Sequence, residues 1–160
     1  MAWSDSHTFA RFWETVLATP AEVLDLNTDT FKAALYDNDI TPDNDATQAN
    51  TCFNAGVWAI SGNEVIDTSG GGADWPTGGV ALTTPSVNVT TDVVYFDAVD
   101  TASGATADLL NAYGCLVYDD TSTTPSDQGV CFNYFGGANS VTNGTFTIVW
   151  HANGIFRMTV

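Results

Sequence analysis

Residues 145–160, TFTIVWHANGIFRMTV, carry the clearest secondary-structure signal in the chain. Over 145–151, Phe146, Ile148 and Trp150 alternate with positions that are mostly Thr, the period of a β-strand with one buried face. Ala-Asn-Gly at 152–154 follows, and Asn-Gly strongly favours a tight turn. The stretch therefore predicts two strands, 145–151 and 155–160, joined by that turn.

Runs of the same kind recur upstream, separated by turn residues. A further strand is expected at 30–36, and the others lie at 80–83, 86–90, 93–97, 109–118 and 130–135. Their number and spacing are typical of a sandwich. The sequence thus predicts a mainly β fold, a single antiparallel β-sandwich or jelly-roll-like domain, with a short N-terminal helix and one further short helix at about 46–53.

The N-terminal segment differs from the rest in its period. Phe9, Phe12, Trp13, Val16 and Leu17 have the spacing of one helical face. Because so short a helix is marginal alone in water, this face must pack on its own domain or on a neighbouring subunit. We expect residues 1–20 to form a helical arm beside a β-sandwich domain at 21–160, with Pro20 closing the helix. The candidate subunit interface is Trp3, Phe9, Phe12, Trp13, Val16 and Leu17.

The charge balance restricts the possible partners. The 160 residues contain 3 Lys plus Arg against 19 Asp plus Glu, a formal net charge of −16. This charge argues against nucleic acid and anionic membrane surfaces as partners, because both bind clustered basic residues. The first 20 residues lack the cationic start and apolar run of a signal peptide, and no stretch has the hydrophobicity of a membrane span.

An acidic loop at 37–45 is the only segment that suggests a metal. Its four carboxylates are Asp37, Asp39, Asp43 and Asp45. The calcium-loop pattern fails, since its required glycine position falls on Pro42 or Gln48, depending on the starting residue. Turn formation and helix capping account for these residues, so we expect no metal site, although calcium binding by this loop stays open.

Catalytic and cofactor motifs are not recognisable in the sequence. There is no GxSxG motif, no Cys–His pairing can be inferred for the two histidines, His7 and His151, and the glycines at 70–72 lack the ending of a phosphate-binding loop. We therefore expect no catalytic or cofactor-binding residue and no enzymatic activity. The three cysteines, Cys52, Cys115 and Cys131, are expected as buried thiols, with a Cys115–Cys131 pair as the alternative.

Tryptophans leave a second kind of site open. Trp3, Trp58 and Trp75 lie outside the regular runs. Such rings could stack on a sugar, or they could close the ends of the sandwich.

Four segments together resemble a family of small acidic proteins of tailed bacteriophages. They are MAWSDSHTFARFWETVLATP (1–20), ALYDNDITPDNDATQANTCFNAGVW (34–58), WPTGGVALT (75–83) and GTFTIVWHANGIFRMTV (144–160). The most specific pieces are FNYFGGANSVTNGTFTI and WHANGIFR.

The resemblance implies a virion component, most simply a capsid decoration or cement protein that binds the major capsid protein, neighbouring copies of itself, or both. The implied location is the capsid surface, after synthesis in the bacterial cytoplasm. Two alternatives stay open, a tail or fibre module that recognises a host-surface glycan and, with less support, a hydrolase.

The alternation over 145–151 predicts that Ile148 is buried and contributes to the free energy of unfolding. Replacing this residue by Ala should lower the free energy of unfolding by about 2–5 kcal/mol, as for other large-to-Ala changes in a core. Urea unfolding of the variant measures the loss. A change below about 0.5 kcal/mol would place Ile148 on the solvent face instead.

Overall fold

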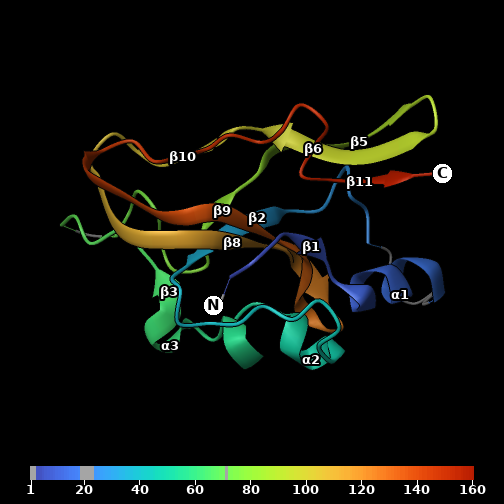
Figure 1. Cartoon of the computed structure of the whole chain (residues 1–160), viewed down its shortest axis with the longest axis horizontal. Coiled ribbons are helices and arrows are strands. Elements are labelled where there is room, and N and C mark those ends of the chain that lie inside the picture. Colours follow the sequence, from blue (N-terminus) through green and yellow to red (C-terminus); the bar gives the residue numbers. More distant parts are fainter. Residues whose placement is uncertain (1–2, 19–23, 71) are drawn as a thin grey trace.

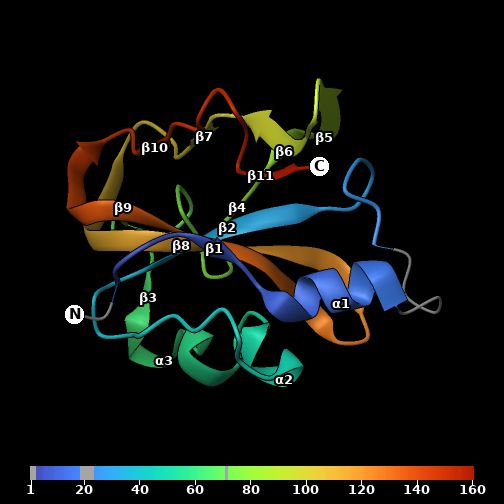
Figure 2. The same ribbon diagram turned by 45° about the vertical axis from the view of Figure 1, so that its right-hand side comes forward.

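The computed structural model describes residues 3–18, 24–70 and 72–160, which stack in three layers (Figure 1, Figure 2). A central sheet lies between two smaller sheets on one side and a layer of short helices and loops on the other. Strands hold 47% of the chain and helices 13%, which confirms the predicted mainly β, antiparallel, sandwich-like class.

The central sheet has the order β1-β9-β8-β2-β3, with β4 also beside β2, and all its pairings are antiparallel. Its strands are β1 (His7–Thr8), β2 (Phe31–Tyr36), β3 (Glu64–Val65), β4 (Val80–Ala81), β8 (Ala107–Thr123) and β9 (Ser126–Gly144). The second layer contains β5 (Thr83–Thr90), β6 (Val93–Val99) and β11 (Phe156–Thr159) in one sheet, and β7 (Thr101–Ala102) with β10 (Thr147–Ile148) in another. The third layer contains α1 (Ala10–Ala18), α2 (Gln48–Thr51), the 3-10 turn Gly56–Trp58 and the kinked α3 (Ile60–Asn63).

The C-terminal stretch has the predicted faces but different partners. Ile148 and Trp150 are buried and Phe146 is half-buried, whereas Val149 is exposed. The turn also forms, since the Gly154 N–H donates to the His151 carbonyl over 2.7 Å. Yet the strands on either side do not pair with each other, because β10 pairs with β7 and β11 pairs with β6. The expected strand at 145–151 is accordingly reduced to β10.

The central sheet is buried on both faces. On β2, Phe31 packs toward the second layer, where its ring centroid lies 5.2 Å from that of Phe96. Tyr36 points to the opposite face and meets Trp58 at 5.1 Å. Five of the six residues of β2 are buried. A strand covered on both sides reads as a continuous apolar run, which fits the sequence FKAALY.

The N-terminal segment is part of this core. β1 pairs with β9, and the rings of Trp3 and Phe9 lie against the face of the central sheet that carries Phe132, at 6.1 and 5.4 Å. Figure 2 shows the segment crossing this sheet before α1 begins. The expected separate arm at 1–20 is therefore corrected: residues 3–18 pack on the sandwich because their aromatic face finds an apolar surface there. Pro20 and the boundary at 20/21 lie outside the described residues.

Two glycines allow this close packing. A Cβ on Gly114 of β8 would come within 2.5 Å of both the Trp3 ring and the Asn133 carbonyl oxygen. A Cβ on Gly129 of β9 would lie 2.1 Å from the Thr51 carbonyl oxygen and 2.8 Å from the Phe9 ring. Only a residue without a side chain therefore fits at either position.

Two smaller expectations have clear outcomes. The helix expected over about 46–53 is only the single turn of α2, because Cys52 has an extended backbone. All three cysteines are buried and free, which confirms the buried thiols and excludes the Cys115–Cys131 pair. No helix among the described residues is both long and apolar enough to cross a membrane.

Replacing Gly114 by Ala should destabilise the fold. The new methyl group would overlap the Trp3 ring and a strand carbonyl, so we expect the free energy of unfolding to fall by about 1–3 kcal/mol. Thr142→Ala, at an exposed position on β9, is the control and should change stability by less than about 0.5 kcal/mol. Urea unfolding followed by tryptophan fluorescence compares them. Equal stability of the two variants would contradict the close approach of Trp3.

Candidate docking side of the sandwich

Two hollowed regions of the described surface differ in their chemistry. The first is an acidic hollow of about 500 Å³ beside β3 and β8. Its carboxylates come from Asp37, Asp39 and Glu64, and Tyr113 and Leu110 form part of its wall. The acidic residues lie on two separate segments of the chain, so the fold brings them together.

Glu64 has a structural partner in this hollow. One carboxylate oxygen accepts the Gly78 N–H over 2.7 Å, and the Gly78 carbonyl in turn accepts the Tyr118 hydroxyl over 2.8 Å. Burial raises the pKa of Glu64 to about 7 against the opposing effect of that N–H donor. Glu64 thus links β3 to the loop that contains Gly78, and its carboxylate is partly shielded from water.

The acidic loop at 37–45 uses its carboxylates for turns. Asp37 accepts the N–H of Asp39, and Asp43 accepts the N–H of Asp45, each over 2.9 Å. This is the local bonding that favours Asp in turns. Among the described residues, no group of three or more His, Cys, Asp or Glu is arranged to hold a metal ion.

Asp67 is a buried carboxylate with a structural role that the sequence analysis did not identify. The residue is only 3% exposed, and its carboxylate accepts the N–H groups of Ser69, Asp74 and Asp108 and the Ser69 hydroxyl. These donors, the Asp108 N–H first, lower the pKa of Asp67 to about 2. The same hydrogen bonds link Ser69 and Asp74 to Asp108 of β8 through the Asp67 carboxylate. No local motif marks this residue, because Asp108 lies 41 positions away in the chain.

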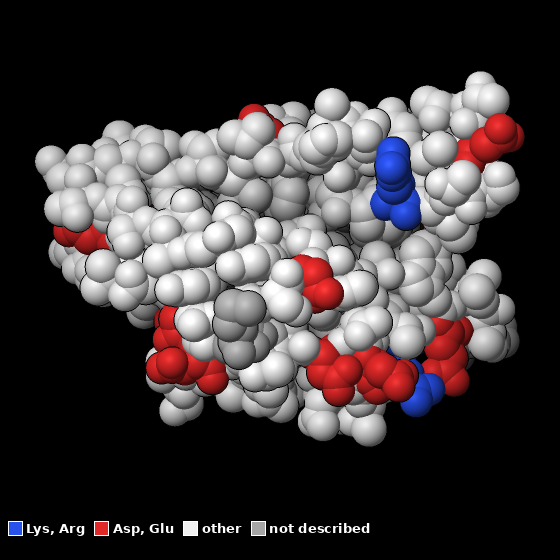
Figure 3. Space-filling model, viewed as in Figure 1, with Lys and Arg blue, Asp and Glu red and all other residues white. Residues whose placement is uncertain are grey.

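The second hollowed region lies between the N-terminal segment, β9 and the C-terminal part of the chain. It consists of adjoining hollows lined by 6–8, 131, 133–135, 139, 146–151 and 154–157. We call this region the open side. None of these lining residues is acidic, in a chain with 19 Asp and Glu. In Figure 3 many of the red acidic atoms lie along the lower, helical layer, and one acidic group lies near the centre of the view.

The open side also holds a large share of the basic groups. His7, His151 and Arg157 all line it. His7 contacts Asp5 over 3.0 Å at its margin, and His151 accepts the N–H of Asn153 in the turn. The hollow nearest Arg157 has a volume of about 280 Å³.

Arg157 differs from the other two cationic residues. Arg11 contacts Glu14 over 2.6 Å, and Lys32 contacts Asp120 over 2.8 Å. No carboxylate of the described residues lies within ion-pair distance of Arg157. The open side therefore carries a positive charge that is available to a partner.

The interface residues expected from the sequence are divided by the fold. Trp3, Phe9 and Phe12 are at most 1% exposed. The expectation that they form a subunit interface is therefore corrected, because they pack in the chain's own core and have no exposed surface to offer. Trp13 is half-buried and donates from its indole N–H to the Thr8 hydroxyl. Val16 and Leu17 are exposed, Leu17 by 81%.

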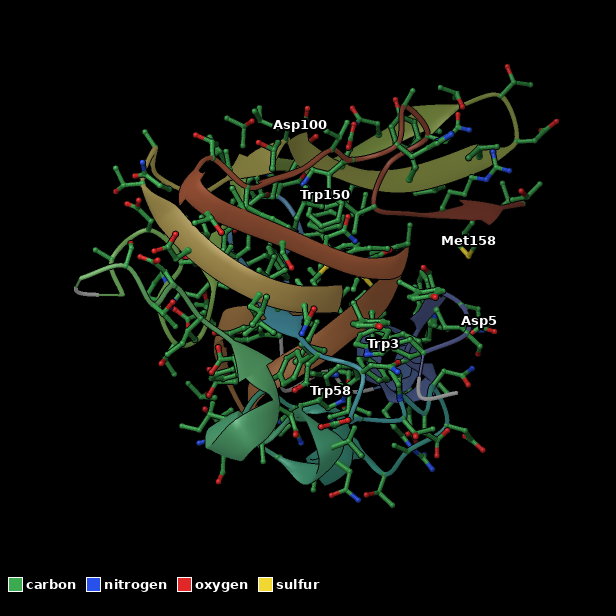
Figure 4. The ribbon with its side chains drawn as sticks, turned by 60° about the vertical axis from the view of Figure 1, so that its left-hand side comes forward. Trp3, Asp5, Trp58, Asp100, Trp150 and Met158 are labelled. Atoms are coloured by element: carbon green, nitrogen blue, oxygen red, sulfur yellow. The ribbon has the colours of Figure 1, made fainter. Side chains whose placement is uncertain are left out.

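Tryptophans do not provide a sugar-stacking surface at the positions named from the sequence. Trp3, Trp58 and Trp75 are at most 1% exposed. Figure 4 shows Trp3 and Trp58 between the central sheet and the helical layer. They fill the core, which removes the exposed rings on which glycan recognition rested.

Comparison with known proteins returns no match: no family model, no curated protein and no solved structure corresponds to this chain.

The buried carboxylates predict how stability depends on pH. Because the pKa of Glu64 is about 7 in the folded chain and near 4.5 when unfolded, the folded state binds the proton more tightly. Stability from this group is therefore full below about pH 4.5 and declines as the pH rises to 7. Asp119, whose pKa burial raises to about 6, acts in the same direction. Glu64→Gln should reduce the decline between pH 5 and 8 by about 1–2 kcal/mol, allowing for partial exposure.

Urea unfolding at each pH measures this slope. Asp92→Asn, at an exposed turn, is the control for the loss of one negative charge. A slope in Glu64→Gln as steep as in the wild-type protein would contradict the burial of Glu64.

Proposed function

We propose that this protein is a bacteriophage virion component that binds a preformed capsid shell as a decoration protein, with the open side of the sandwich as its docking surface. The observation that carries the proposal is the segregation of charge. A strongly acidic molecule presents one hollowed side without acidic lining residues, and there lies Arg157, which no carboxylate of the described residues pairs.

Segregated charge suits a protein that joins an assembly from solution. The net charge of −16 keeps free copies apart and soluble. Hollows without acidic lining residues reduce that repulsion at the point of contact, since unpaired acidic groups would be costly to bury there. The resemblance to small acidic phage proteins supports the same role, and it supplies the shell as the partner.

The remaining exposed residues of the predicted interface extend this surface. Phe12 and Trp13 of α1 both contact the Phe156 ring of β11 at 5.7 Å, so α1 and β11 lie at the same end of the molecule. Val16 and Leu17 are exposed on this helix. We assign them a peripheral contact to the shell or to a neighbouring copy.

Cosedimentation tests the proposed function. Purified protein is mixed with particles of the source phage that were assembled without it, and the pelleted fraction is measured against protein concentration. We expect saturable binding with a fixed number of copies per shell. Double-stranded DNA of equal mass is the control and should bind no protein, because phosphate repels this net charge.

Absence of binding to particles at any concentration would contradict the decoration role. Binding confined to isolated tails would instead favour the tail or fibre alternative, and electron microscopy of the decorated particles separates the two locations.

A further inference from the structure

We propose that the free edge of β11 is a strand-addition site that takes one extended segment of the shell protein, with acidic and apolar side chains in alternation. The inference rests on the proposed function for the identity of the partner. The geometric argument uses three features of the three-stranded sheet β11-β6-β5, which is called the outer sheet below. They are the direction of its backbone groups, the unequal protection of its two edges, and the side chains of β11.

Hydrogen bonding within the outer sheet fixes which groups of β11 are free. β11 pairs only with β6, and the Val160 N–H donates to the Asp92 carbonyl across that pair over 2.9 Å. Backbone groups of an antiparallel strand alternate between its two sides. The N–H and C=O groups of Arg157 and Thr159 therefore point away from β6, and neither residue has a backbone hydrogen bond to another described residue on that side.

The opposite edge of the same sheet is protected. On β5, the Val87 N–H is already bonded to the Asn27 side chain over 2.8 Å, and Pro85 has no N–H to offer. Capping groups and proline are the usual means by which proteins block edge strands. The described part of the chain provides neither on β11, so the sheet is closed to strand addition at one edge and open at the other.

The side chains of β11 define the chemistry of the segment that fits. Phe156 and Met158 share one face, since they pair with Phe96 and Val94 of β6, and that face is apolar. Figure 4 shows Met158 pointing from β11 toward the N-terminal segment, and this side chain is 41% exposed. Arg157 and Thr159 occupy the other face. Cross-strand neighbours lie on the same face of a sheet, so an added strand would place apolar side chains beside Met158 and a carboxylate beside Arg157.

A second copy of this chain is a poorer occupant. Symmetrical pairing of two β11 strands would bring together two Phe-Arg-Met-Thr segments, which contain no acidic residue and carry one arginine each. The two guanidinium groups would then lie close without a counter-charge. A different protein with an acidic strand satisfies Arg157, which no carboxylate of the described chain does.

The test uses the full-length protein and source-phage particles assembled without it. Thr159→Pro removes one outward N–H and leaves the β6 hydrogen bonds in place, and Arg157→Gln removes the charge. Each should weaken binding to particles about tenfold, which corresponds to about 1.4 kcal/mol. Val89→Pro, at an exposed position on the protected strand β5, is the matched control and should bind as the wild type does. The affinity of the wild type should fall with added salt, and that of Arg157→Gln should fall less.

Thermal unfolding of each variant checks that the fold survives. Hydrogen exchange of the wild type gives an independent measure, because the amides of Arg157 and Thr159 should become protected only on the particle. Wild-type binding without this protection, and with both variants at full affinity, would overturn the strand-addition site while leaving the decoration role intact. Protection in the free protein together with a dimeric mass would identify a second copy as the occupant and also overturn it. Failure of the wild type to bind particles would remove the proposed function and, with it, the partner.

Discussion

The fold depends on the burial of the central sheet on both faces by aromatic side chains that come from distant parts of the chain. On one face the rings of Trp3, Phe9 and Trp58 lie on β8 and β9, and the absence of side chains at Gly114 and Gly129 leaves room for them. Large apolar rings remove much surface from water when they are packed in this way. Trp3 and Phe9 therefore help to complete the core, and the molecule has two outer layers because its central layer is apolar on both sides.

How far the fold could be predicted depends on the range of the interaction. The alternation of Phe146, Ile148 and Trp150 identified the buried face of its segment, because a strand's period is a local property. The partners of β10 and β11 were not predictable in the same way, since the paired residues of β7 and β6 lie 45 to 66 positions away and no turn type specifies them. The helix period of α1 was read correctly, whereas its place against the sheet depends on Gly114 and Gly129, whose importance no local pattern shows.

The candidate docking side was even less accessible to sequence reasoning. The hollows of the open side have no acidic lining residue, although the chain has 19 Asp and Glu. This property depends on where the fold places each acidic residue, so the sequence alone does not show it. Arg157 is a single cation in an unremarkable strand. The structure shows that Glu14 and Asp120 pair with the other two cations, whereas no carboxylate within the described ranges pairs with Arg157. Pro85 is a local signal for the strand-addition site, because a proline within a strand indicates an edge strand. It does not show whether the opposite edge of the sheet is protected.

Acidic residues in this chain have two separable roles, and the distinction explains why their number alone did not identify a site. Asp37, Asp43 and Asp67 bind backbone N–H groups and thereby shape loops, so these carboxylates are used within the fold. Others remain on the surface and give the molecule its net charge. Neither role requires a ligand, so the number of carboxylates alone marks no site. The surface carboxylates repel other acidic molecules, whereas no carboxylate of the described residues lies within ion-pair distance of Arg157 at the free edge of β11. The position of each charge, rather than the net charge, therefore distinguishes one surface of this molecule from another.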